Sequence, residues 1–325
     1  MPYTNLIGAG WAVNGAPLLP GGGAIPLAMN YLFVNNATGF NGSDGNAGTM
    51  DAPFATLNAA LVVASATGTY PTGSVVILVG QGHAETITGN TGIAFNVAGI
   101  QIIGLGTGAN RPTFTFTTAN TNRIAVTAAN IKIQNLVFIG NFLSIATLFL
   151  VGAAPGFIID SCAFRDTDAT HGFLSIVTTT VSTDSNGLTF TNNEVISLAT
   201  TTPGPAVVVL NTMDRLNISY NYILRNVANN DVANIVSHAA LVVSRLNLAY
   251  NVVWSANTST ATGGCLLTTT ATTGSGLIYN NYCAGADAAD QIMFPAIAVQ
   301  YGAFNNQYAY VTGAKSGFLL PAIGP

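Results

Sequence analysis

The chain has 325 residues, of which 49% are hydrophobic and only 6% are charged, and its formal net charge is −4. An ordinary soluble domain carries about 25% charged residues, so this chain must cover its surface with Thr, Asn, Ser and Gly or bury it against a partner. The first basic residue is Arg111, and no cluster of Lys and Arg marks a phosphate-binding surface. The composition therefore argues against nucleic acid as a partner.

Residues 1–30 contain no charged side chain. They also lack the basic start and the continuous apolar stretch of a signal peptide, so we expect no cleavable export signal. We predict an arm over residues 1–30 that becomes ordered against a partner subunit, with a disordered tail as the alternative. Residues 142–159 are apolar but interrupted by Gly and Pro, and they are shorter than the roughly 20 residues of a spanning helix. A membrane is not an expected partner.

Residues 31–73 predict a strand, a loop rich in Gly and Asn, and a short helix. Asp51 is available as the helix N-cap, and Pro53 lies near the first turn. The open end of a solenoid exposes its apolar core and needs a capping unit, and we predict that this helix is the cap. Its apolar residues recur at helical spacing at Phe54, Leu57, Leu61 and Ala64.

A repeat occupies most of the chain from residue 74 to residue 310. Six similar segments start at residues 131, 157, 188, 216, 246 and 276, which are 26, 31, 28, 30 and 30 residues apart. Each segment begins with apolar residues at every second position, which indicates a strand. Strand-bearing repeats of this length predict an all-β fold, a right-handed parallel β-helix over 74–310, followed by a C-terminal tail over 311–325.

The same position of successive repeats is occupied by asparagine. Asn tolerates the left-handed α conformation, so it suits a tight bend between two strands. Amides stacked at the strand spacing of about 4.8 Å can also hydrogen-bond along the column. We therefore predict a structural Asn ladder, although frequent Asn aligned by eye is the alternative reading. The predicted ladder residues are Asn193, Asn221, Asn251, Asn281 and Asn306.

Several segments resemble known families. The repeat unit, together with DAPFATLNAAL and SVVILVGQGHAETIT, resembles the pectate-lyase-like family of right-handed parallel β-helices. The segments GHAETIT, GLGTGANRPTFTF, IAVTAANIKIQNLVFIGNF and SGFLLPAIGP resemble structural proteins of tailed bacteriophages, and this resemblance spans nearly residues 30–325. It implies a virion component and, by analogy, a trimer.

Acidic residues are few and thinly spread, twelve in the whole chain. Polysaccharide lyases and hydrolases on the fold that the resemblance implies work through carboxylates, an Arg or Lys base, or calcium held by Asp. In the register of the repeats, no second carboxylate lies next to Asp160 on a neighbouring coil. We therefore favour a solvated loop closed by Arg165 and predict no catalytic residue. The densest group is Asp160, Arg165, Asp166, Asp168 and His171.

Cysteines and tyrosines offer weaker signals. The three cysteines, Cys162, Cys265 and Cys283, are odd in number and widely spaced, so we expect buried thiols, no disulfide framework, no metal and no cofactor. Recurring tyrosines predict either an aromatic ladder, which we favour, or a strip on which sugars stack. These tyrosines are Tyr220, Tyr222, Tyr250, Tyr279 and Tyr282.

The function that these features predict is a bacteriophage capsid decoration or cement protein that is not an enzyme. Its expected location is the outer capsid surface of the virion, after synthesis in the host cytoplasm. Its expected partners are the major capsid protein and copies of itself in a homotrimer, with a host surface glycan as a further partner. The alternative is a tailspike-like or free enzyme that binds or depolymerises a bacterial surface glycan.

Overall fold

The computed structural model describes most of the chain between residues 30 and 310, together with short strands near both ends. The described residues are 30–66, 70–71, 73–89, 93–180, 184–198, 204–225, 235–239, 241–255, 266–269, 273–285 and 300–310, with 6–7, 10–13, 16–17 and 319–321. Cys265 and Asp231 lie outside them.

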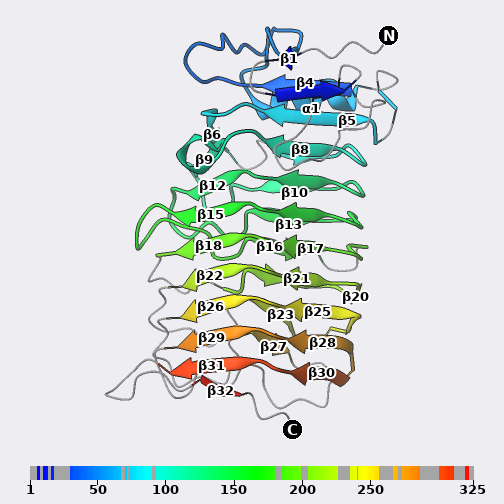
Figure 1. The fold of residues 1–325 in the computed structure, drawn as a ribbon, viewed down its shortest axis with the longest axis vertical. Helices are drawn as coiled ribbons and strands as arrows, with labels where there is room; N and C mark the ends of the chain where they lie inside the picture. The colour runs from blue at the N-terminus through cyan, green and yellow to red at the C-terminus, as the bar shows by residue number, and fades with distance from the viewer. Residues whose placement is uncertain are drawn as a thin grey trace.

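The chain folds into a parallel β-helix, as the repeat predicts (Figure 1). The strands of the coils form three sheets, which we number in the order in which a complete coil visits them. Sheet 1 has seven parallel strands: β7 (Ile93–Phe95), β10 (Ile124–Val126), β13 (Phe149–Val151), β16 (Val177–Thr179), β19 (Val207–Val208), β23 (Val236–Ala239) and β27 (Leu267–Thr269).

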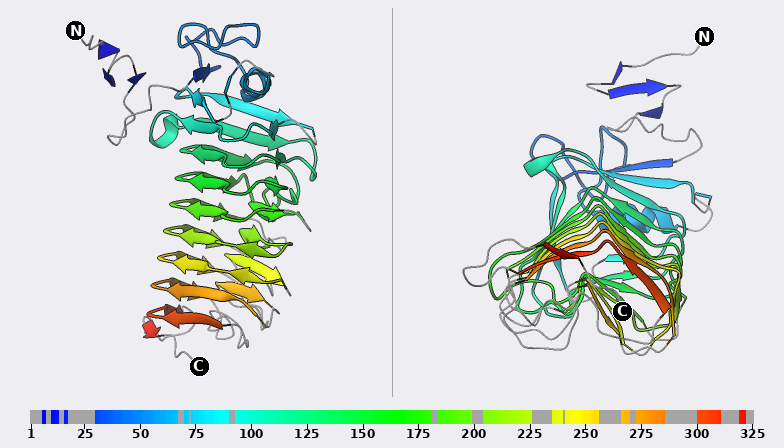
Figure 2. Two further views of the ribbon diagram at one scale, coloured as in Figure 1. Left: turned by 90° about the vertical axis from the view of Figure 1, so that its right-hand side faces the viewer. Right: turned by 60° about the horizontal axis from the view of Figure 1, so that its bottom comes forward.

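Sheets 2 and 3 have ten strands each and meet at a sharp corner, seen end-on in Figure 2. Sheet 2 contains β4 (Asn30–Val34), β5 (Val75–Val79), β8 (Gln101–Gly104), β11 (Lys132–Gln134), β14 (Ile158–Asp160), β17 (Thr189–Thr191), β21 (Asn217–Ser219), β25 (Leu246–Ala249), β28 (Ser275–Tyr279) and β30 (Gln300–Phe304). Sheet 3 contains β6 (Ala84–Thr88), β9 (Thr113–Thr117), β12 (Val137–Gly140), β15 (Ala163–Asp166), β18 (Glu194–Ser197), β22 (Tyr222–Arg225), β26 (Val252–Ser255), β29 (Tyr282–Gly285), β31 (Gln307–Tyr310) and β32 (Leu319–Pro321).

The remaining elements are small. A three-stranded antiparallel sheet near the N-terminus contains β1 (Leu6–Ile7), β2 (Gly10–Val13) and β3 (Ala16–Pro17). Two further strands, β20 (Met213–Asp214) and β24 (Val243–Ser244), pair in parallel between sheets 1 and 2. A 3-10 turn, η1 (Gly108–Asn110), precedes β9. Within the described residues, no α-helix has both the length and the apolar character of a membrane span.

Both ends of the stack differ from the plain repeat. β4 pairs in parallel with β5, so the strands of sheet 2 begin to stack at residue 30, before the predicted start at residue 74. At the other end, β32 pairs antiparallel with β31. Apart from β1, β2, β3 and residue 30, the predicted arm lies outside the described residues, and so does the predicted tail apart from β32.

The core consists of the side chains that alternate inward along each strand. Rings from successive coils stack on one another: the centroids of Phe114 and Phe138 lie 5.7 Å apart, and those of Phe138 and Phe164 lie 5.6 Å apart. All three residues are at most 1% exposed. Because each ring is covered by its neighbours above and below, the apolar alternation of the sequence becomes a continuous buried column.

Helix α1 (Leu57–Ser65) packs at the N-terminal end of this core. Its N-cap is Thr56, whose side-chain oxygen accepts the backbone N–H of Ala59. The prediction of Asp51 as the cap is wrong, because the helix begins six residues later; the Asp44 carboxylate instead accepts the backbone N–H and the hydroxyl of Thr56. The residues that face the core are Leu57, Ala60, Leu61 and Ala64.

From β11 onward, a single residue in the left-handed conformation makes each bend between sheets 2 and 3. We predicted this conformation for the ladder asparagines, but the residue before each of them adopts it. Examples are Asn192 with φ 55°, Tyr220 with φ 59° and Tyr250 with φ 56°. The bend turns the next side chain inward, and the ladder residue is buried beside the core.

The buried asparagines are hydrogen-bonded along the stack. Asn193, Asn221, Asn251, Asn281 and Asn306 are at most 1% exposed. The Nδ2 of Asn251 donates to the Oδ1 of Asn281 at 2.9 Å and to the carbonyl of Ile218 at 3.0 Å. Its own Oδ1 accepts the backbone N–H and the Nδ2 of Asn221. Each such amide therefore satisfies backbone and side-chain groups of the adjacent coils.

Candidate functional site

The outer face of sheet 3 carries two adjoining hollows. The strands of this sheet expose their first and third side chains, while the second points into the core. The outer face of sheet 1 offers less chemistry, because its outward residues in the described strands β7, β10, β13, β16 and β19 are Ala94, Ala125, Leu150, Thr178 and Val208.

The first hollow, which we name the charged hollow, lies over β9, β12, β15 and β18 and has a volume of about 360 Å³. Within it, Nη2 of Arg165 lies 2.5 Å from Oε2 of Glu194. The two side chains are 29% and 42% exposed, so a ligand can reach both partners of the pair. The residues that line the hollow are Gly108, Ala109, Arg111, Thr113, Val137, Ala163, Arg165 and Glu194.

Arg111 adds a second guanidinium to the charged hollow. It follows η1, and its Nη2 donates to the carbonyls of Leu136 at 3.1 Å and Ser161 at 2.6 Å. These carbonyls hold the side chain against the corner of the stack. Burial lowers the pKa of Arg111 from its ordinary value, and the nearby charge of Arg165 acts in the same direction. Glu194 offsets part of this repulsion, and an anion bound between the two cations would offset it further.

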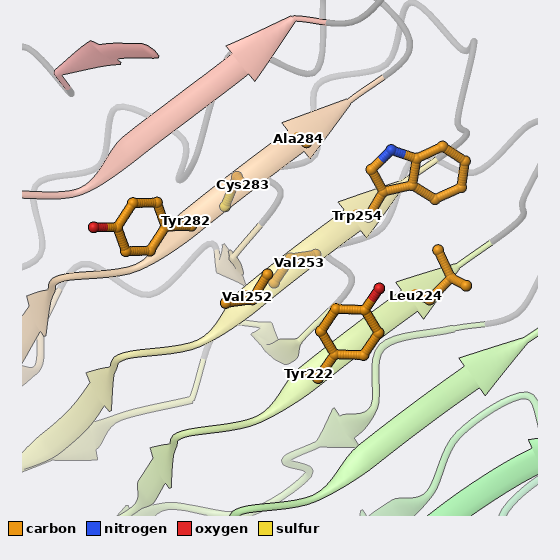
Figure 3. Close-up of a pocket in the computed structure, with 8 residues that line it drawn as sticks. All are labelled: Tyr222, Leu224, Val252, Val253, Trp254, Tyr282, Cys283 and Ala284. Atoms are coloured by element: carbon orange, nitrogen blue, oxygen red, sulfur yellow. The ribbon is translucent and has the colours of Figure 1, made fainter. Parts of the chain in front are cut away.

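The second hollow, which we name the aromatic hollow, lies over β22, β26 and β29 and has a volume of about 510 Å³ (Figure 3). Tyr222 and Tyr282 are 45% and 46% exposed, with Val252 between them. In Figure 3, both phenol rings and the indole of Trp254 are seen face-on. The residues that line this hollow are Tyr222, Leu224, Val252, Val253, Trp254, Tyr282, Cys283 and Ala284.

The two hollows are neighbours on one face. Glu194 of β18 and Tyr222 of β22 are register partners, so one strand step separates the last residue of the charged hollow from the first of the aromatic hollow. The face therefore changes from charged to aromatic along the stack from β9 to β29.

The predicted tyrosine series divides into two sets. At the corner between sheets 2 and 3, Tyr220 and Tyr250 stack at 4.8 Å with 5° between their planes, and Tyr279 stacks with Phe304 at 5.0 Å. These rings cover one another's faces, as in an aromatic ladder. Tyr222 and Tyr282 lie on the outer face of sheet 3 and are two strands apart.

The predicted cluster of charged residues does not meet at one turn. Asp160 lies at the corner, where it accepts the Thr191 hydroxyl and the Asn192 amide. Asp166 ends β15 and accepts the Ser197 hydroxyl at 2.6 Å. Because consecutive residues of a strand point to opposite faces, Arg165 and Asp166 cannot share a site.

Asp168 and His171 form a separate pair in the loop after β15. The Nδ1 of His171 lies 2.8 Å from Oδ2 of Asp168, and both side chains are about half exposed. Hydrogen bonds from the backbone and hydroxyl of Thr170, and from His171, hold the pKa of Asp168 well below its ordinary range. The prediction that Arg165 closes this loop is wrong, because Arg165 pairs with Glu194 on the next coil.

Glu194 is the site residue that the sequence prediction missed. It directly follows Asn193, and the repeat register places it beside Ala163, two residues before Arg165. That diagonal spacing across adjacent strands is the signal that could have revealed the pair.

Other predicted residues have structural partners. His83 accepts the backbone N–H of Asn36 and lies 3.2 Å from Glu85, whose carboxylate accepts the first N–H of α1 from Leu57. Cys162 and Cys283 are buried, and burial raises the pKa of Cys162 to about 12. Among the described residues, no group of three or more His, Cys, Asp or Glu could hold a metal ion.

The chain was compared with known proteins. No protein-family model matches the chain, and no curated protein matches it. A rhamnogalacturonan lyase structure is similar, with TM-score 0.42, 14% identity, and coverage of 81% of this chain and 71% of that one. A lacto-N-biosidase structure from Eubacterium ramulus has TM-score 0.39, 9% identity, and coverage of 87% and 68%. At these values the likeness is one of overall architecture.

These names correct one prediction. The prediction that the chain is not an enzyme is contradicted, because both similar structures are enzymes by name, a lyase and a glycosidase, and we do not retain it. Neither is named as a phage protein, so the phage relationship stays a prediction from the sequence.

Proposed function

We propose that this protein binds an acidic glycan along the outer face of sheet 3 and cleaves it. The observation that carries the proposal is the charged hollow, where two guanidinium groups and one carboxylate line an open depression of about 360 Å³. Hollows of several hundred Å³ with a few convergent polar groups are the usual form of small-ligand sites.

The arginines provide the recognition of an acid group. A guanidinium binds a carboxylate or sulfate through two parallel hydrogen bonds. Arg165 already holds such a group in Glu194. Because an exposed ion pair contributes only about 0–1 kcal/mol, a sugar carboxylate can replace Glu194 on Arg165 at little cost. The exchange would leave the Glu194 carboxylate unpaired beside the bound sugar.

The groups of the charged hollow fit elimination better than hydrolysis. Glycoside hydrolysis commonly uses two carboxylates roughly 5–9.5 Å apart, and Glu194 is the one acid among the residues that line this hollow. In elimination, Glu194 takes the proton from the carbon next to the sugar carboxylate. That electron pair forms a C=C bond and breaks the bond to the glycosidic oxygen, which takes up a proton from water, while Glu194 returns its own proton to solvent. The arginines stabilise the charge that develops on the carboxylate.

A virion-attached form of this protein is the second candidate. The phage-like segments quoted above support it, as does a chain with only 6% charged residues, which suits a surface that partner subunits cover. Quantitative mass spectrometry of purified particles tests it. Tens to hundreds of copies would support capsid decoration, a handful would support a tailspike, and absence would exclude a virion location.

The test of the main proposal uses the full chain and a panel of uronate-containing polysaccharides. We expect release of products whose new double bond absorbs ultraviolet light. Arg165→Gln and Glu194→Gln should abolish this signal. The matched controls are Lys132→Gln on β11 and Asp51→Asn on an exposed loop, which change charge equally but elsewhere. Full activity in Glu194→Gln would overturn the assignment of the base, and binding without any product would overturn cleavage.

A further inference from the structure

We infer that the aromatic hollow is a second subsite of the same site and takes the uncharged sugar rings that follow an acidic sugar in the glycan. This inference rests on the proposed function. It deepens that function by naming the substrate class, a heteroglycan in which a run of neutral sugars follows an acidic sugar, rather than a uniform polyacid.

The chemistry of the aromatic hollow matches an uncharged sugar. Its eight lining residues include no charged side chain. A pyranose has apolar C–H faces and a rim of hydroxyls, so it packs on an aromatic face while its hydroxyls meet polar groups at the edge. Tyr provides both surfaces in one side chain, and an indole provides a large face with one N–H donor. An acidic sugar would gain no counter-charge there.

The rings of this hollow are available to a ligand. Tyr222 and Tyr282 lie two strands apart, about 9.6 Å at the strand spacing, which is too far for them to stack on each other. Val252 lies between them and is 42% exposed. The corner pair Tyr220 and Tyr250 stack at 4.8 Å and so cover each other's faces. Contiguous exposed apolar surface of this kind is typical of ligand-binding grooves and interaction sites.

The register sets the order of the two subsites. Glu194 and Tyr222 are partners on adjacent strands, so the acidic sugar and the first neutral sugar lie about one strand spacing apart, near 4.8 Å. Tyr282 is two steps further. The glycan therefore crosses the strands along the axis of the stack, with its acidic sugar toward β9 and its neutral sugars toward β29.

The test compares glycans of different composition by calorimetric titration of the full chain. We expect Tyr222→Ala and Tyr282→Ala to weaken binding of an acidic–neutral hetero-oligosaccharide about tenfold, in line with the usual value of an aromatic contact. The same variants should leave binding of a short uronate oligomer unchanged. The matched control is Tyr250→Asn, which removes an exposed corner ring but keeps a residue suited to the bend, as Asn192 and Asn280 show.

The outcomes separate this inference from the proposed function. If Arg165→Gln abolishes binding of the uronate oligomer while Tyr282→Ala leaves the hetero-oligosaccharide unaffected, the neutral-sugar subsite is wrong and the proposed function stands. If neither variant changes binding of either ligand, both are wrong. If Tyr222→Ala and Tyr282→Ala change the oligomeric state in sedimentation without changing glycan affinity, the hollow is an interface between copies of the chain, and the inference is overturned.

Discussion

Glu194 and Tyr222 are register partners on β18 and β22, so the charged and aromatic hollows meet at a single strand step of sheet 3. A ligand that spans this step would therefore contact two surfaces that bind it through different interactions. Interactions with the arginines are electrostatic and partly exposed to solvent, whereas packing on the aromatic rings is not screened by ions.

Added salt should therefore weaken binding at the charged hollow but not at the aromatic hollow. Between about 0.1 M and 1 M salt the screening length falls from about 10 Å to 3 Å, so binding of an acidic hetero-oligosaccharide should weaken. Arg165→Gln should reduce the dependence of the binding affinity on salt concentration. Tyr282→Ala should lower the affinity without changing that dependence. Titration calorimetry at several salt concentrations measures both. An unchanged salt dependence in Arg165→Gln would show that the acid group of the glycan binds elsewhere.

Asn251→Ala should lower the free energy of unfolding by about 3 kcal/mol. The substitution leaves two donors of Asn221 without their acceptor and removes one donor to the carbonyl of Ile218, and each buried unsatisfied group costs about 1–3 kcal/mol. Urea unfolding of both variants measures the difference. Asn247→Ala is the control, because that half-buried side chain makes one bond to Asn217, and it should cost less than about 1 kcal/mol. If Asn251→Ala and Asn247→Ala lowered the free energy of unfolding equally, the buried hydrogen bonds of the ladder would contribute no more to stability than a half-buried one.

Stability should fall in mild acid because of His238. Its ring is fully buried, with Nδ1 2.9 Å from the Leu241 carbonyl and Nε2 3.3 Å from the Tyr301 hydroxyl. Burial lowers the pKa of His238 below its ordinary value of 6.5. The unfolded chain therefore takes up a proton first as the pH falls through 6.5, and folding loses free energy until the folded state is also protonated.

Thermal unfolding between about pH 7 and pH 5.5 checks this window, which lies above the range where ordinary carboxylates titrate. His238→Gln should reduce the dependence of the melting temperature on pH. A slope that survives in His238→Gln would assign the acid sensitivity to another group.

Arg225→Met should raise the free energy of unfolding by about 1 kcal/mol. Arg225 is 1% exposed, its Nε and Nη1 have no hydrogen-bond partner, and burial lowers its pKa to about 10. The Asp166 carboxylate is the charge that opposes this lowering. Replacing a buried charge with an apolar residue of similar volume is stabilising when the charged partner left behind remains hydrogen-bonded. Asp166 keeps its bonds from Ser197 and Phe173 in the variant. Denaturant titration measures the change, with Arg225→Ala as the volume control. A marked loss of stability in Arg225→Met would show that the charge itself supports the fold.

The sequence by itself determined the parallel β-helix. Apolar alternation and a repeat near 30 residues point to stacked strands, because a solenoid buries its core through contacts between neighbouring repeats that share one pattern. The column of equivalent asparagines that contains Asn251 follows from the same repeat. The sequence did not distinguish the residue that bends from the residue that is buried, since Asn occurs at both positions in the coil of Asn192 and Asn193.

Only the tertiary structure decided which distant side chains share a surface. Arg165 and Glu194 are 29 residues apart but meet because adjacent coils place β15 beside β18. Local sequence instead grouped Arg165 with Asp166, which the strand directs to the opposite face. The helix cap shows the same limit, since Asp44 reaches Thr56 across a loop. A pattern along the chain predicts which face a residue lies on, whereas contacts across coils depend on coil lengths, which vary from repeat to repeat.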